Sequence, residues 1–198
     1  MSFNFITGTD GDDSLLGTDG ADAIFARNGR DTVDGAGGND EIGGADGRDL
    51  LIGGTGNDTI FGNDEEDTIE GGAGNDRLFG GRGDDTIVGG TGNDRITGGN
   101  RNDDLIGGDG FDTFVFFDGD DSDTISDYNP DQDVLSFPDN NSVTIREVVQ
   151  FNIPTGFLIE AGGGDGVRIL EFNPTYSSVD LANSILDANV NFGSPIFL

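Results

Sequence analysis

The chain contains no cysteine, no histidine and no lysine. Without cysteine it forms neither disulfides nor zinc–thiolate sites, and without histidine it has no Ser-His-Asp, Cys-His or zinc-protease centre. Nine basic residues oppose 39 acidic ones, and the net charge of -30 argues against nucleic acid and anionic membranes as partners. No apolar run approaches the ~20 residues of a transmembrane segment. Residues 1–10 resemble no signal peptide.

What the chain does contain is a nonapeptide, G-G-x-G-x-D-x-U-x with U a large apolar residue, which recurs twelve times without a gap from Gly8 to Val115. The first position is glycine in eleven units and the fourth in ten. Aspartate occupies the sixth position of every unit: Asp13, Asp22, Asp31, Asp40, Asp49, Asp58, Asp67, Asp76, Asp85, Asp94, Asp103 and Asp112.

The eighth position is always apolar, from Leu15 to Phe114. One such residue in nine predicts a three-residue strand with its middle side chain inside, followed by a six-residue turn. A single unit cannot bury a core, so the units must stack into a solenoid. Glycines at positions one and four are expected to supply the positive φ that a tight turn needs.

Burying twelve apolar side chains does not offset the conformational entropy lost when a glycine-rich chain is ordered. The loops must therefore be held by something else, such as a bound ion. If two units make one turn, the aspartates of units n and n+2 lie on one edge, about 4.8 Å apart. A calcium ion midway would lie about 2.4 Å from each loop, at the length of a Ca–O bond. Carbonyl oxygens would complete its shell of six to eight ligands.

The array resembles the repeats-in-toxin (RTX) calcium-binding proteins. Its end, from Gly107 to Phe116 followed by Asp123–Tyr128 and Asp133–Leu135, is similar to the way RTX arrays end. The resemblance implies an all-β, right-handed parallel β-roll, calcium between successive loops, type I secretion and folding outside the cell. It implies ligation by the sixth-position aspartates and by loop carbonyls. Beyond the twelve repeat aspartates, the expected metal-site residues are Gly17, Gly20, Gly35, Gly38, Gly53, Gly56, Gly71, Gly74, Gly89, Gly92, Gly107, Gly110 and Asp123.

We divide the chain into a capping strand (1–7), the β-roll (8–136, with a degenerate turn after 115) and a C-terminal cap with a possible secretion signal (137–198). Short strands are expected at 143–149, 156–161 and 167–172, separated by Pro154 and by glycines 162–164. Ser178 would cap one short helix that ends near Ala188.

The two edges of the predicted roll differ. Even-numbered units keep glycine at positions one and four, whereas every departure, Ala26, Glu65 and Arg101, falls on the odd edge. The loop arginines also lie there: Arg27, Arg30, Arg48, Arg82 and Arg101. One interpretation is drift, with arginine offsetting carboxylate charge; the other is a surface that contacts an anionic sugar or a second copy. Asp123 and Asp127 are either ligands of a terminal calcium or solvated turn carboxylates.

We expect a secreted or cell-surface, non-enzymatic calcium-binding module with a structural or binding role. Five gaps between loops on each edge allow up to about ten calcium ions, with one or two more at the C-terminal turn. The alternative is a calcium-dependent module that binds polysaccharide or another cell-surface component, similar to the accessory modules of alginate epimerases. Glycoside cleavage by paired carboxylates ranks third, because calcium already claims the acids.

Overall fold

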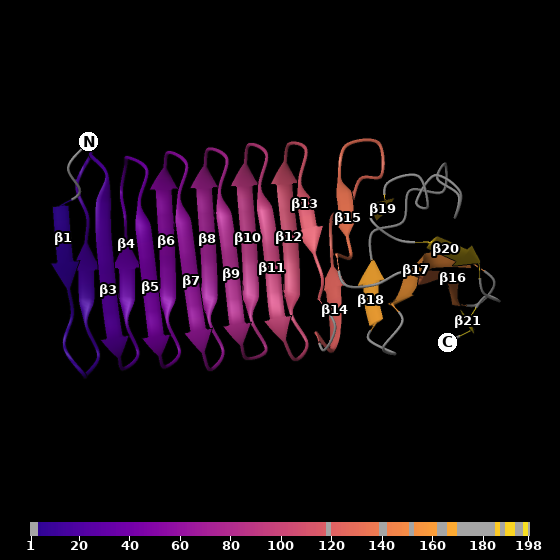
Figure 1. The fold of residues 1–198 in the computed structure, drawn as a ribbon, viewed down its shortest axis with the longest axis horizontal. Helices are drawn as coiled ribbons and strands as arrows, with labels where there is room; N and C mark the ends of the chain where they lie inside the picture. The colour runs from indigo at the N-terminus through magenta and orange to yellow at the C-terminus, as the bar shows by residue number, and fades with distance from the viewer. Residues whose placement is uncertain are drawn as a thin grey trace.

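Two nonapeptides make each turn of a parallel coil, and the turns stack side by side along the chain (Figure 1). The register shows this directly, because Ile60 pairs with Leu78 and Ile69 with Ile87, each eighteen residues further on. The computed structural model describes residues 4–117, 120–138, 142–150, 153–161, 166–169, 185–186, 189–192 and 196–197. The predicted all-β parallel solenoid is confirmed.

The strands form two sheets that face one another. Sheet A contains nine strands in this order: β1 (Asn4–Thr7), β3 (Asp22–Asn28), β5 (Glu41–Asp46), β7 (Thr59–Asp64), β9 (Arg77–Arg82), β11 (Arg95–Asn100), β13 (Thr113–Val115), β15 (Val134–Ser136) and β19 (Ile185–Leu186). Sheet B begins with β2 (Ser14–Leu16), β4 (Thr32–Asp34), β6 (Leu50–Thr55), β8 (Thr68–Ala73), β10 (Thr86–Thr91), β12 (Asp104–Asp109) and β14 (Ser122–Ile125).

Sheet B continues into the C-terminal part through β18 (Gly166–Ile169), β17 (Ile153–Ala161), β16 (Ser142–Gln150) and β20 (Asn189–Phe192), while β21 (Ile196–Phe197) also pairs with β16. The pairs β16–β17 and β17–β18 are antiparallel, which confirms the predicted strands at 143–149 and 156–161 and the first part of that at 167–172, whose residues 170–172 lie outside the described residues. Pro154 does not separate strands as expected: it lies within β17, next to a register shift between Val148 and Val149. A proline is tolerated at such an irregularity because no ladder hydrogen bond is needed there.

The core is the column of eighth-position side chains between the sheets. From unit two onward each is fully buried: Ile24, Val33, Ile42, Leu51, Ile60, Ile69, Leu78, Ile87, Ile96, Leu105 and Phe114. Leu15 of the first unit is half-buried, and Ile6 of β1 pairs with Ile24 and packs against the same column. Residues 4–7 thus form a strand at the end of sheet A, with Ile6 in the phase of the eighth-position residues.

Most strands are twice as long as predicted. A strand such as β7 begins at the seventh position of one unit, Thr59, and ends at the third position of the next, Asp64. Positions one to three therefore continue the ladder, as the pairing of Gly54 with Gly72 shows. Only positions four to six remain outside the strands, so the sixth-position aspartate closes a three-residue loop.

The expected helix is wrong where the structure tests it. Ile185 and Leu186 form β19, which extends sheet A by pairing with Leu135 and Ser136. Pairing satisfies the free edge of β15, which a helix at this position would leave open. Residues 178–184 and the glycines 162–164 lie outside the described residues. The described segments include no helix long and apolar enough to cross a membrane.

Candidate metal-binding site

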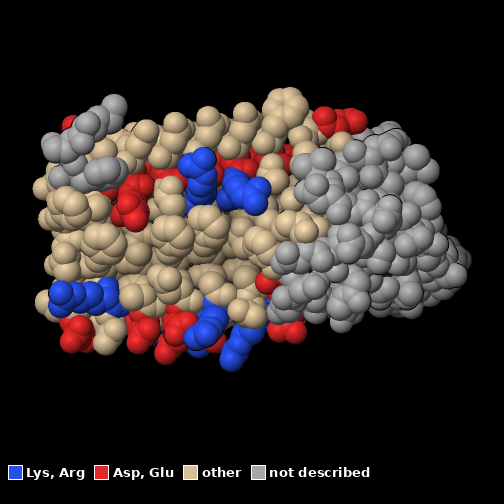
Figure 2. Space-filling model, in the orientation of Figure 1, with Lys and Arg blue, Asp and Glu red and all other residues tan. Residues whose placement is uncertain are grey.

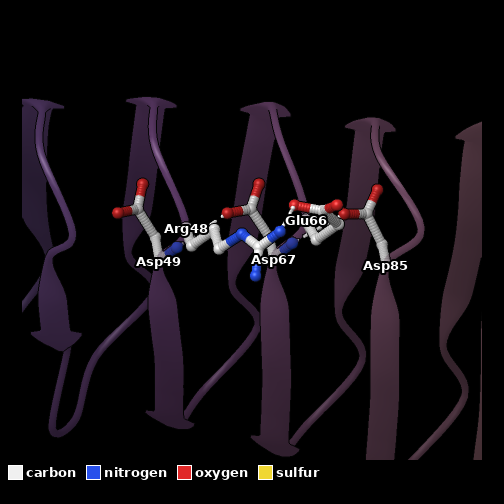
Figure 3. Close-up of polar contacts among 5 residues, drawn as sticks. All are labelled: Arg48, Asp49, Glu66, Asp67 and Asp85. Atoms are coloured by element: carbon white, nitrogen blue, oxygen red, sulfur yellow. Dashed lines mark hydrogen bonds and ion pairs between the residues drawn. The ribbon is translucent and has the colours of Figure 1, made fainter.

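The sixth-position aspartates form one ladder along each edge of the roll. From Asp22 to Asp112 they are at most 4% exposed. One carboxylate oxygen, Oδ1, accepts the backbone N–H of the equivalent aspartate in the preceding turn, as Asp67 does from Asp49 and Asp85 from Asp67, both at 2.8 Å. Figure 3 shows these three carboxylates in the same orientation on successive turns. These hydrogen bonds hold each aspartate side chain against its neighbour in the next turn without a metal ion.

The second oxygen, Oδ2, is buried and has no hydrogen-bond donor in ten of these twelve residues and in one aspartate of the degenerate turn: Asp31, Asp40, Asp49, Asp58, Asp67, Asp76, Asp85, Asp94, Asp103, Asp112 and Asp123. A buried carboxylate oxygen without a partner is strongly unfavourable. The regular repetition of this feature on both edges indicates that a cation is the missing partner.

Burial accordingly raises the pKa of nearly all these carboxyls above the ordinary value of 3.8. The pKa is raised by burial to about 6 for Asp58 and, with repulsion from Asp85, Asp49 and Glu65, to about 8 for Asp67. For Asp103 it reaches about 9, because burial is joined by repulsion from neighbouring carboxylates, including Asp123. Without a cation, the folded chain would therefore hold protons at neutral pH on carboxyls such as Asp67 and Asp103, whereas those with a pKa of about 6, such as Asp58, would be mostly charged and buried without a counter-ion.

Glycine at position one is needed for space and not, as predicted, for positive φ. A Cβ built on Gly71 would lie 2.6 Å from Asp76 Oδ2 and 2.6 Å from the carbonyl oxygen of Gly89 in the next turn. The same construction on Gly89 gives 2.5 Å to Asp94 Oδ2 and 2.5 Å to the next carbonyl. At these distances no methyl group fits unless its neighbours move. None of the first-position residues has positive φ.

Positive φ occurs at positions two and four instead. Gly56, Gly74 and Gly92, all at position four, have φ between 126° and 142°. Glu65 and Arg101 replace glycine there and still adopt φ of 78° and 84°. Position two imposes the same conformation on four further residues that sequence reasoning missed: Arg27, Ala36, Ala45 and Asn63. Of these six side chains held at positive φ, five lie on the odd edge.

The carbonyl groups of the predicted glycines point between the turns. The position-one carbonyls of Gly35, Gly53, Gly71, Gly89 and Gly107 each face the space beside the first glycine two units earlier. At position four, the carbonyl oxygens of Gly38, Gly56, Gly74 and Gly92 each lie against the fourth glycine of the next turn. Within the described residues no three acidic side chains converge on one point. A cation held here therefore needs these carbonyls as ligands.

The first two units depart from this arrangement, and the sequence prediction grouped them with the rest. Asp13 and Asp22 retain donors for Oδ2, from Thr9 and Thr18 respectively. Although burial acts to raise it, the pKa of Asp22 lies below 3.8, because Thr18 and Asn4 donate hydrogen bonds to the carboxylate. Threonine at position two of a unit is the signal that would have distinguished these loops.

At the other end, the odd ladder continues into the degenerate turn. Asp103 N–H donates to Asp123 Oδ1 at 2.9 Å, and Asp123 Oδ2 is unpartnered, which places Asp123 in the position predicted for it. Both carboxylate oxygens of Asp127, by contrast, already have hydrogen-bond donors: they accept the N–H groups of Gly107 and Gly108 at 2.9 and 2.7 Å. Asp127 therefore holds the backbone of unit twelve.

Charges on the odd edge pair with one another between turns. Arg48 contacts Glu66 at 2.6 Å, as Figure 3 shows, and Arg82 contacts Asp64 at 3.3 Å. In Figure 2 blue and red atoms gather along the lower edge, which carries the odd-numbered loops, whereas the upper edge is mostly tan. These contacts support arginine as a local offset of carboxylate charge, since two of the five loop arginines already have partners.

The stacked glycine-rich loops, each with one buried carboxylate and inward carbonyls, define a calcium-binding β-roll. The chain belongs to the RTX calcium-binding nonapeptide repeat family, whose model matches residues 7–42, 43–78 and 79–114. No curated protein matches the chain significantly.

Among solved structures, the extracellular lipase LipA from Serratia marcescens is 16% identical with a TM-score of 0.34, over 93% of this chain and 40% of the lipase. The AlgE6R3 subunit of the Azotobacter vinelandii mannuronan C5-epimerase is 24% identical with a TM-score of 0.30, over 71% of this chain and 80% of that subunit. The chain thus spans well under half of the lipase.

Proposed function

We propose that this chain is a secreted module that folds when it binds extracellular calcium and then serves a structural or binding role without catalysis. The observation that carries the proposal is the set of buried Oδ2 atoms without donors. Each requires a proton or a cation, and at neutral pH calcium is the partner that the oxygen-only surroundings favour.

Calcium suits these gaps better than magnesium. Each gap is lined by a fixed carboxylate oxygen and by carbonyl oxygens of successive turns, and calcium accepts six to eight oxygen ligands in flexible geometry. Magnesium requires about 2.0–2.1 Å and near-ideal octahedral geometry, which a row of identical, fixed loops does not offer. In the bound protein, the sixth-position aspartates and the position-one and position-four carbonyls would hold the ions, up to about ten in all. Bound calcium would neutralise carboxylates that otherwise face one another across each gap.

The two edges would hold their ions with unequal strength. Ala26 places a methyl group at position one, where a Cβ in the other units would crowd the ladder carboxylate and the next carbonyl, and this residue is fully buried. Glu65 and Arg101 are held at positive φ, which stores strain in their loops. All three lie on the odd edge, so the even edge is the stronger ladder.

Export suits a protein of this kind because cytosolic calcium is scarce and extracellular calcium is abundant. A chain that stays unfolded until it meets calcium can pass through a secretion channel, which supports type I secretion as the route. Arg48 and Arg82 pair with acidic neighbours, so two of the five loop arginines that favoured an anionic sugar as ligand already have partners within the roll. We therefore do not adopt polysaccharide binding.

The test is a calcium titration of the calcium-free chain at pH 7.5, followed by far-UV circular dichroism. We expect a cooperative gain of β-structure with a midpoint of about 10⁻⁴–10⁻³ M, as in extracellular modules. Asp76→Asn, which removes the charge of a buried ladder carboxylate, should raise the midpoint. Asp109→Asn removes the same charge from the exposed end of β12 and serves as control. A β-rich spectrum in excess chelator would refute the proposal.

A further inference from the structure

The second residue of each unit decides which backbone its loop adopts. In units three to twelve this residue always has positive φ, whether or not it is glycine: Arg27, Ala36, Ala45, Gly54, Asn63, Gly72, Gly81, Gly90, Gly99 and Gly108. In the first two units it is Thr9 or Thr18, and neither has positive φ. A β-branched side chain strongly resists that conformation. Threonine therefore gives these two loops a different shape.

In that shape each threonine binds the aspartate of its own loop. Thr9 donates its backbone N–H and its hydroxyl to Asp13 Oδ2 at 2.6 and 2.9 Å. Thr18 makes the same two hydrogen bonds to Asp22 Oδ2, at 2.6 and 3.0 Å. The equivalent oxygen in each later regular unit has no donor. Two hydrogen bonds thus stand where the later loops need a cation.

The other oxygen of Asp22 is satisfied by a neutral group as well. Asn4 occupies the sixth position of the repeat frame in β1, pairs with Asp22, and donates its side-chain amide to Asp22 Oδ1 at 2.9 Å. Asp22 is fully buried, and both of its oxygens are satisfied within the protein. The ladder connection to the next turn is kept, because Asp22 N–H still donates to Asp40 Oδ1 at 2.8 Å.

We propose that the first turn of the roll is a cation-free cap, in which Thr9 and Thr18 replace calcium, so that the ladders of ions begin one turn later. This inference rests on the proposed function. It assigns no ion to the gaps between Asp13 and Asp31 and between Asp22 and Asp40. The gaps from Asp31 and Asp40 onward, where Oδ2 is unpartnered, hold the ions.

Such a cap avoids a weak ion site at the open end of the roll. An ion in the first gap would have the outermost loop on one side, where solvent reaches the ligands: Asp13 is half-buried, whereas its counterparts in later turns are buried. Hydrogen bonds from the loop itself hold the outermost aspartates at any calcium concentration. The N-terminal turn therefore closes the roll without the ion that the interior loops require.

The test compares the wild-type chain with the double variant Thr9→Gly/Thr18→Gly, which restores the loop sequence of the later units. The control is Thr55→Gly/Thr91→Gly, the same change at the exposed last residues of β6 and β10, for which no side-chain hydrogen bond to a repeat aspartate is found. Calcium per folded chain is counted by native mass spectrometry at saturating calcium. Ions are placed by anomalous diffraction from wild-type crystals grown with calcium or soaked in terbium.

We expect no ion in the two N-terminal gaps of the wild type, about two additional ions in the double variant, and an unchanged count in the control. An ion in either N-terminal gap of the wild type would overturn the inference, and so would a folded double variant with an unchanged count. Should the double variant not fold, the wild-type anomalous map decides alone. A wild-type chain that takes up no calcium would refute the proposed function and this inference with it.

Discussion

Replacing Arg101 by glycine should stabilise the calcium-bound protein, although glycine ordinarily destabilises a folded chain. Arg101 is the fourth residue of its unit and has a φ of 84°, in a place where Gly56, Gly74 and Gly92 adopt 126–142°. The left-handed conformation brings Cβ toward the following carbonyl oxygen. Glycine removes that contact, together with a positive charge two residues from Asp103.

The backbone terms set the size of the effect. Relief of the left-handed conformation is worth about 1–2 kcal/mol. Greater freedom of glycine in the unfolded chain offsets roughly 0.5–1 kcal/mol of this. We therefore expect Arg101→Gly to raise the free energy of unfolding by about 0.5–1 kcal/mol at saturating calcium. Loss of the guanidinium charge beside a calcium-binding loop acts in the same direction.

Urea unfolding at fixed, saturating calcium, followed by circular dichroism, measures this change. Arg30→Gly is the matched control, because Arg30 is an exposed arginine of the same edge without positive φ. That control loses the same charge and gains the same unfolded-state freedom, so it should be destabilised by about 0.5–1 kcal/mol. The two variants should thus differ by about 1–2 kcal/mol. Equal effects would show that φ at position four carries no strain.

Three further predictions concern the ladders. Asp76→Ala and Asp67→Ala each remove an acceptor of one 2.8 Å backbone hydrogen bond, so their difference reports on the metal sites. Because Glu65 strains the loop of Asp67, Asp76→Ala should raise the calcium midpoint more; equal midpoints would make the two edges equivalent. Ala26→Gly should tighten calcium binding in calorimetry by removing a methyl group that crowds the ladder carboxylate, whereas Ala73→Gly at the exposed end of β8 should not; matching isotherms would contradict this. Finally, burial and carboxylate repulsion raise the pKa of Asp67 to about 8, so the calcium-free fold binds protons that the unfolded chain releases. Its stability is therefore greatest near the unfolded pKa of about 4 and is lost as pH rises toward about 8. Calcium-stripped protein should gain β-structure on acidification, and a constant far-UV spectrum between pH 8 and 4.5 would exclude this linkage.

Local features of the repeat made the array predictable. One apolar residue in nine identifies the buried column. Because the period is constant, the same frame applies to every unit, and it also places Ile6 of β1 in the correct phase. The degenerate turn followed from the same frame, because Asp123 and Ile125 keep their spacing after a two-residue insertion. Position-specific aspartates then located the ladders on both edges.

Three-dimensional contacts between turns decided the rest. Glycine at position one was correctly marked as essential but for the wrong reason, because its role depends on a carbonyl of the next turn that no single unit reveals. The strand at Ile185 replaced a predicted helix because the free edge of β15 is created only by the stacked roll. Threonine at position two marks units one and two in the sequence, but only the folded loops show that the hydroxyls of Thr9 and Thr18 bind the aspartates that calcium would otherwise hold. Periodic burial is a property of the chain alone, whereas the environment of each carboxylate depends on neighbours eighteen residues away.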